Sequence, residues 1–398
     1  MGFVDLFCAA SMPVLKVLIV TAVGSFLALD SINILGQTTR KQVNEVSFSC
    51  SSSSMIHLYL ATMLSDSQMF GSGHAGWFMP VNILLTFVIG SVLGWVLMII
   101  AKPPQHLKGL ILGACSAGNL GNLLLIIVPA VCKEKGTPFG DSDVCYEYGM
   151  AYASLSMAIG AVFLWSYVYN LVRLFSKDSG NNQTEPAQED LNQPLLPESE
   201  SESESLTKRE GKMKVILHSM QQQWREFSRH INLKAVLAPS TTGAIVGFII
   251  GTIAPIRRLL IGTTAPLRVI QDSACLVGDA AVPTVTLIVG GNLLRGLKGS
   301  GISIALVLGI AAVRYIFLPL FGILIVKGAL YFGLVRADPL YLFVLLLQFA
   351  LPPAMNIGTI TQLFGAGESD CSVIMLWTYG LASISLTLWS TFFMWLVA

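Results

Sequence analysis

Long apolar runs recur along most of the chain, and they limit its possible folds more than any other feature. Clear examples cover residues 77–101, 149–175 and 372–398. A helix needs about 20 consecutive apolar residues to cross a lipid bilayer, and these runs reach that length. Charged residues make up 12% of the chain, about half of the fraction that is usual in soluble domains. The sequence therefore predicts an all-α polytopic membrane protein that lies in the lipid bilayer.

The apolar runs divide into two sets of five, which predicts ten transmembrane helices. Residues 1–175 form the first set and residues 233–398 form the second. Between them, residues 176–232 are polar and are expected to form a disordered and amphipathic cytosolic loop. The second span, at about residues 45–76, is degenerate because its centre is a serine run. Its apolar part is about half as long as a bilayer requires.

Two of the expected spans are interrupted near their middle. The ninth span contains Pro352, Pro353 and Asn356. Adjacent prolines remove backbone donors and clash with the preceding turn, so a helix must break there. The fourth span has two asparagines among glycines and then a proline, namely Asn119, Asn122 and Pro129. In lipid, freed backbone groups are tolerated only beside protein or a water-filled cavity, so each break is either part of a site or a simple proline kink.

The matching positions of the two breaks favour a transporter. Five spans per set is an odd number, so two such sets in one chain must lie inverted relative to each other in the membrane. We therefore predict two inverted five-helix repeats, in which the interrupted spans four and nine cross. Such a crossing would provide a polar site near the middle of the bilayer, as in secondary transporters.

Basic residues determine the predicted orientation of the spans. Lysines and arginines near residues 40–41, 102–108 and 208–234 fall on one side, which we assign to the cytosol. The acidic loop after the fourth span and both chain ends fall on the other side. Cys132 and Cys145 flank this loop and could pair, but buried free thiols are the favoured interpretation. The seven cysteines are scattered and show no metal-ligand spacing, so neither a zinc site nor a disulfide framework is supported. No cofactor is expected.

Polar side chains inside the spans suit recognition of a small organic anion. The neutral amides at or near the breaks are Asn119, Asn122, Asn356, Gln348 and Gln362. Helix N-termini at the breaks add partial positive charge, which favours a carboxylate. For each single amide, the alternative is an ordinary hydrogen bond between helices. Asp279 and Arg314 are ionisable at membrane depth, so they are either functional, with Asp279 binding a proton or sodium ion, or a structural ion pair.

Other classes of function are disfavoured by the sequence. The chain lacks the HExxH, GxSxG and P-loop patterns of common enzymes. Gly278 and Asp279 lack the preceding glycine of the intramembrane aspartyl protease pattern, since Leu276 stands there. The net charge of +1 gives no reason to expect a nucleic acid partner. We therefore expect a transporter and not an enzyme.

Several stretches of the chain resemble one plant family closely. They are Trp77 to Asn82, Ala117 to Asn122, Val131 to Gly136, Phe139 to Asp141, Tyr148 to Ala158 and Ala350 to Glu368. These stretches resemble the PIN-LIKES family of the auxin efflux carrier superfamily, and the match extends over the chain outside residues 45–76. The resemblance implies a carrier with two inverted repeats of five spans. It also implies that the carrier moves auxin, chiefly indole-3-acetic acid, between the cytosol and the lumen of the endoplasmic reticulum.

The resemblance further implies where auxin binds. In the related PIN-FORMED carriers, the crossover of spans four and nine holds the auxin carboxylate near an asparagine of span four. Alignment on Pro129 gives that asparagine as Asn122, although Gly121 stands where the relatives have a proline. In span nine the counterpart is the double proline, with Asn356 as the nearest amide. Family members have a longer apolar segment in span two, and this chain departs from them there.

The leading hypothesis is a facilitative or potential-driven auxin carrier of the endoplasmic reticulum membrane. Spans three to five and eight to ten would move as a group against a scaffold of spans one, two, six and seven. One alternative is a sodium- or proton-coupled symporter of another organic anion. Another is a regulatory membrane protein that transports nothing. The expected partners are the auxin anion, the bilayer and a second copy of the chain in a homodimer.

Overall fold

The computed structural model describes residues 77–134, 137–181, 253–260 and 301–398 except residue 366, and short pieces within 7–43 and 265–292. Within these residues, four helices are long and apolar enough to cross a membrane: Phe78–Ala101, Ser142–Ser176, Ile304–Tyr331 and Ser369–Val397. Spans two and six, the loop at 182–232 and Asp279 lie outside the described residues, so the predictions about them are not addressed by this fold. The described part of the chain is a multi-pass helical membrane protein.

Two parts of the chain repeat the same order of a long helix, a broken helix and another long helix. The first part contains α4 (Phe78–Ala101), α5 (Gln105–Ser116), α6 (Asn122–Lys133), α7 (Ser142–Phe163), η1 (Leu164–Val168) and α8 (Tyr169–Asn181). The second contains α14 (Ile304–Ala312), η2 (Val313–Phe317), α15 (Leu318–Tyr331), α16 (Pro339–Ala350), α17 (Asn356–Phe364) and α18 (Glu368–Val397). The short helix α12 (Ala254–Leu260) lies between them in the sequence. Both η elements are single π-helical segments inside a long helix.

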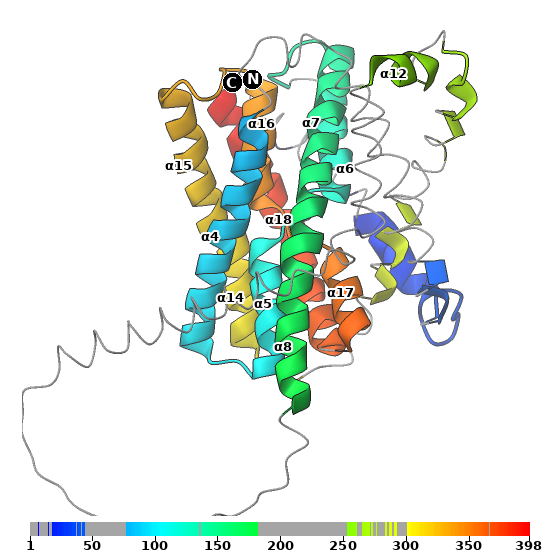
Figure 1. The fold of residues 1–398 in the computed structure, drawn as a ribbon, viewed down its shortest axis with the longest axis vertical. Coiled ribbons are helices and arrows are strands. Elements are labelled where there is room, and N and C mark those ends of the chain that lie inside the picture. The colour runs from blue at the N-terminus through cyan, green and yellow to red at the C-terminus, as the bar shows by residue number, and fades with distance from the viewer. Residues whose placement is uncertain are drawn as a thin grey trace, which may run out of the picture.

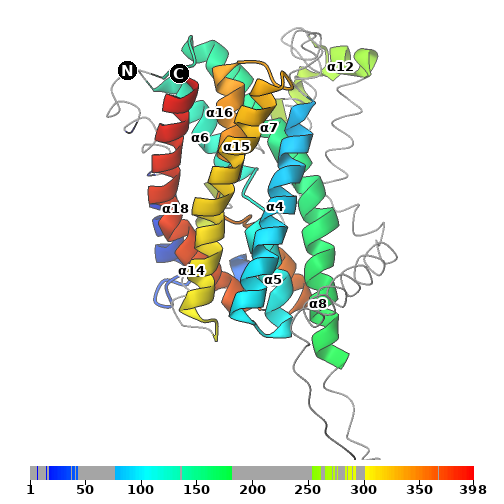
Figure 2. The same cartoon turned by 90° about the vertical axis from the view of Figure 1, so that its left-hand side faces the viewer.

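The broken helices of the two parts run in opposite directions. Figure 1 shows α5 and α17 at one end of the bundle, with α6 and α16 at the other. The last long helices of the two parts follow the same rule. Figure 2 shows α7 above α8, so this helix runs downward, whereas α18 runs upward and ends at the top, where the C-terminus is marked. The C-terminus of the chain, at the end of α18, lies at the end of the bundle where α16 begins (Figures 1 and 2).

Each broken helix ends at a residue with an extended backbone. Leu351 has an extended backbone, with φ −74° and ψ 147°, because a residue before proline is excluded from the helical region. Ala117, at the end of α5, is also extended, with φ −88° and ψ 112°. Pro129 lies inside α6 and is buried, so it is not part of the break that begins at Ala117. The prediction that the interruption of span four reaches as far as Pro129 is therefore wrong.

Helix α16 lies in the centre of the bundle. Every residue from Leu340 to Ala350 is buried, and the helix packs against α4, α7, α15 and α18. By contrast, α4 exposes an apolar stripe at helical spacing, formed by Val81, Leu84, Val88 and Val92. In a multi-pass membrane protein such a stripe faces lipid tails. The broken helix is thus surrounded by protein, which is where irregular backbone is tolerated in a membrane.

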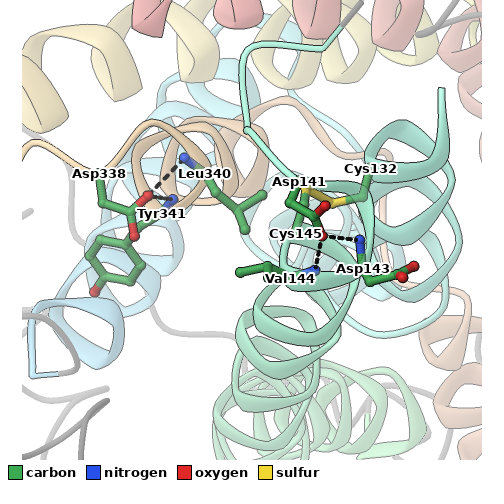
Figure 3. The surroundings of a disulfide bond; sticks show 8 residues. All are labelled: Cys132, Asp141, Asp143, Val144, Cys145, Asp338, Leu340 and Tyr341. Atoms are coloured by element: carbon green, nitrogen blue, oxygen red, sulfur yellow. Dashed lines mark hydrogen bonds between the residues drawn. A yellow bond between two sulfur atoms is a disulfide. The ribbon is translucent and has the colours of Figure 1, made fainter. Parts of the chain in front are cut away.

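A disulfide bond joins Cys132, near the end of α6, to Cys145, near the start of α7. The interpretation of these cysteines as free thiols was wrong, because the short loop between α6 and α7 returns the chain and brings the two Cα atoms to 5.4 Å. Asp141 fixes the start of α7 by accepting hydrogen bonds from the backbone amides of Asp143 and Val144 (Figure 3). Asp338 caps α16 in the same way, through the amides of Leu340 and Tyr341 (Figure 3).

Candidate functional site

The two helix breaks pair with each other through their backbones. Gly118 and Pro353 form an isolated antiparallel bridge. The amide of Asn119 donates to the carbonyl oxygen of Pro352 at 2.8 Å, and the amide of Ala354 donates to the carbonyl oxygen of Ala117 at 2.9 Å. The two interrupted spans therefore cross, as predicted. Their pairing satisfies backbone groups that each break would otherwise leave without partners in an apolar interior.

Four helix ends meet at this crossing. The C-termini of α5 and α16 approach it, and α6 and α17 begin just beyond it at Asn122 and Asn356. Helix N-termini have partial positive charge and amide groups that can bind an anion. The capping residues Gly121 and Met355 contribute no side-chain hydrogen bond to these N-termini. Helix N-termini inside proteins are common places for an anion to bind.

Asn119 is tied to the opposite break through a tyrosine of the last helix. Its side-chain amide donates to the hydroxyl of Tyr379 at 2.9 Å, and this hydroxyl donates to the carbonyl oxygen of Pro353, also at 2.9 Å. Both side chains are buried, with 5% and 8% of their surface exposed. One hydroxyl thus links an amide of span four to a carbonyl of span nine and fixes the distance between the two breaks.

Replacing Tyr379 by phenylalanine should destabilise the crossing. The change leaves the Asn119 amide and the Pro353 carbonyl without this partner, and each buried unpaired group costs about 1–3 kcal/mol. We expect a clear fall in the melting temperature of the purified protein, measured by thermal unfolding in detergent. Tyr331→Phe is the matched control, because Tyr331 is 86% exposed. Equal melting temperatures for the two variants would contradict a role for the Tyr379 hydroxyl.

Arg314 lies at the crossing, and its side chain forms hydrogen bonds to both breaks. Its guanidinium donates to the carbonyl oxygens of Cys115 at 3.1 Å, Ser116 at 3.5 Å and Pro352 at 3.1 Å. The side chain is only 1% exposed. Asp279, which the sequence offers as one possible partner of Arg314, lies outside the described residues.

Gln348 is part of a separate polar cluster that links three spans. Its amide nitrogen donates to the hydroxyl of Ser156 at 2.7 Å, and its amide oxygen accepts from the side chain of Asn82 at 2.7 Å. Asn82 also donates to the carbonyl oxygen of Leu345 at 3.1 Å. All three side chains of the cluster are buried. These contacts are hydrogen bonds between the helices α4, α7 and α16. For Gln348, the structure thus shows the interhelical hydrogen bonds that were the alternative to anion recognition.

The remaining predicted residues lie on the two helices that begin after the breaks. Asn122 is the first residue of α6, and Asn356 is the first residue of α17 and is half-buried. Gln362 lies further along α17 and is also half-buried. The sequence reasoning missed Tyr379, which is 26 residues away from Pro353. No local pattern marks that tyrosine, whereas Asn82 could have been noticed as the last residue of a stretch that resembles the family.

Comparison with known proteins agrees with this architecture. The family model described as "Membrane transport protein" matches residues 9–390. Protein PIN-LIKES 3 of Arabidopsis thaliana is 53% identical over 396 residues, covering 99% of both chains. Protein PIN-LIKES 1 is 50% identical over 398 residues, covering all of this chain and 81% of the relative. Protein PIN-LIKES 4 is 46% identical over 422 residues and covers both chains fully.

Proposed function

Because this chain belongs to the membrane transport protein family, and within it to the PIN-LIKES proteins, we propose that it is an auxin carrier that binds indole-3-acetate at the crossing of its two broken helices. The observation on which this proposal rests is the backbone pairing of Gly118 with Pro353. It brings the N-termini of α6 and α17 to one place inside the protein. A site of this kind attracts a carboxylate through amide groups and partial charges and can also release it, because no permanent ion pair has to break.

The carrier would have ten spans in two inverted repeats. The opposite directions of the two described sets of helices support this arrangement (Figures 1 and 2). In the proposed cycle, the described bundle of spans three to five and eight to ten moves against the remaining spans, so that the crossing opens to one side of the membrane and then to the other.

We further propose that one of these sides is the lumen of the endoplasmic reticulum. The loop between α6 and α7 was assigned to the non-cytosolic side from its charges, and the Cys132–Cys145 disulfide lies beside it (Figure 3). Disulfides form and persist in oxidising compartments such as this lumen and are rare in the cytosol. Charge pattern and cysteine chemistry therefore favour the same orientation.

The direct test is the flux of radiolabelled indole-3-acetate into vesicles that contain the purified full-length chain. A facilitative or potential-driven carrier should transport after the sodium and proton gradients have been collapsed. Flux that stops when one of these gradients is removed would instead identify a coupled symporter. If a folded and monodisperse preparation shows no flux or binding, the proposed carrier function is wrong and a regulatory role is favoured.

Asn122→Ala should lower the affinity for indole-3-acetate by at least several-fold. Asn122 is the first residue of α6, where the positive end of that helix meets the crossing, and it aligns with the asparagine that the family resemblance implicates. The affinity is measured by binding of the radiolabelled compound to the purified protein. Asn170→Ala is the control, because the Asn170 amide donates to the carbonyl oxygen of Ser166 in its own helix. Unchanged affinity in Asn122→Ala would exclude Asn122 from the site.

A further inference from the structure

We propose that Arg314 is a positioning residue that makes the crossing selective for anions, by neutralising the negative ends of the two helices that stop there. This inference rests on the proposed function, since it concerns the same site. It assigns the charge preference of that site to a residue that need not touch the substrate.

The guanidinium contacts the carbonyls that end both broken helices. Cys115 and Ser116 are the last two residues of α5, and Pro352 follows the end of α16 by two residues. Their carbonyl oxygens accept from the two terminal nitrogens of Arg314. The rigid fork of an arginine suits this role, because it can hold two acceptors in fixed directions at once. One side chain therefore occupies acceptors from both halves of the crossing.

The electrostatic consequence follows from the helix ends that meet at this point. Two C-termini contribute partial negative charge and two N-termini contribute partial positive charge, so helix ends alone would roughly cancel. The full positive charge of Arg314 lies on the two C-termini. The partial charges of α6 and α17 then remain uncompensated, and the crossing as a whole favours a negative ligand. In a water-poor interior such charges act much more strongly than at a surface.

The guanidinium also retains binding capacity. Its Nε atom is buried and has no hydrogen-bond partner among the described residues. Within the described part of the chain, the partners of Arg314 are neutral carbonyls, which orient its charge without cancelling it.

Two local features of the sequence bring the guanidinium to the crossing. Arg314 lies in the π-helical segment η2, and such segments are frequent at functional sites. On the other side, Gly118 has no side chain, and a Cβ there would lie 2.6 Å from a terminal nitrogen of Arg314. The lack of a side chain at Gly118 thus leaves room for the guanidinium of Arg314.

The test compares a charged ligand with a neutral ligand of the same shape. Competition against radiolabelled indole-3-acetate gives the affinities of indole-3-acetate and indole-3-acetamide for the full-length protein in nanodiscs. In Arg314→Gln, we expect the ratio of these two affinities to fall about tenfold or more, which corresponds to about 1.4 kcal/mol. In Arg314→Lys, the ratio should stay close to that of the unmodified chain, even where both affinities fall, because the charge is kept. Arg268→Gln, a surface arginine changed in the same way, should leave the ratio unchanged.

A purely structural role for Arg314 would weaken both ligands equally and keep their ratio in every folded variant, which would overturn the inference. A ratio that collapses in Arg314→Lys would also overturn it, since the charge remains there, and this variant decides the question if Arg314→Gln does not fold. If the unmodified chain binds neither compound, the proposed function itself is wrong. If the unmodified chain binds both and Arg314→Gln keeps the same affinity ratio, only the role of Arg314 is wrong.

Discussion

Replacing Gly118 by leucine should reduce indole-3-acetate transport to background. Gly118 is the bridge residue opposite Pro353, and the Leu351 side chain lies 3.5 Å and a nitrogen of Arg314 lies 2.6 Å from the place of its missing Cβ. A leucine there must push the two breaks apart or displace the guanidinium. Overpacking of this kind costs about 1–3 kcal/mol in stability. It also separates the helix N-termini that we propose as the anion site. Uptake into vesicles and the melting temperature are the two measurements.

Gly380→Leu is the matched control for this change. Gly380 follows Tyr379 in α18, is exposed, and has no atom within 4 Å of its missing Cβ. A leucine at this position meets open space, so uptake and melting temperature should stay near those of the unmodified chain. If Gly118→Leu transports as well as Gly380→Leu, close contact at the bridge is not required for transport.

Loss of the Cys132–Cys145 disulfide should lower the stability of the protein by about 3 kcal/mol, the value expected for a closed loop of roughly this length. The two cysteines are 13 residues apart in the sequence. The bond restricts the unfolded chain and holds the end of α6 against the start of α7. We expect both the double variant Cys132→Ser/Cys145→Ser and the reduced native protein to melt several degrees lower. Thermal unfolding with and without a reductant measures the effect.

The double variant supplies the control for the reductant. With no disulfide left to break, its melting temperature should not change when a reductant is added. A native protein that melts at the same temperature in both conditions would show that the bond does not contribute to stability. Labelling of thiols in intact microsomes gives a separate readout, because free Cys132 and Cys145 in the native chain would argue against an oxidising side.

The breaks themselves were predictable from the sequence because they follow from local backbone chemistry. Two adjacent prolines end α16, because neither can donate the backbone hydrogen bond of a helix. The glycines and asparagines after α5 disfavour a helix less strongly. The apolar runs also predicted α4 within one residue, since Trp77 and Ala101 lie at the edges of a single continuous stretch. The crossing was expected from the matching positions of the breaks, and the hydrogen bonds of Asn119 and Ala354 confirm it.

The partners of individual side chains could not be predicted in this way. Tyr379 and Arg314 come from different helices, and their contacts depend on how those helices pack, which no short stretch of sequence encodes. The disulfide was missed for a related reason, since the spacing of two cysteines alone does not distinguish a disulfide bond from two buried free thiols. Gln348 was selected by its residue type, but its two bonds to Asn82 and Ser156 show it linking helices beside the crossing.

The hydrogen bonds that hold the crossing have one further consequence. Within the described residues, the ties of Asn119, Ala354, Tyr379 and Arg314 all join helices of the same bundle. A displacement of that bundle as one body would leave each of these bonds intact. The main barrier of a transport cycle would then arise where the bundle meets the other spans and the surrounding lipid. Turnover should accordingly depend on bilayer thickness, since mismatch with the hydrocarbon layer has an energetic cost, while the affinity of the site should not.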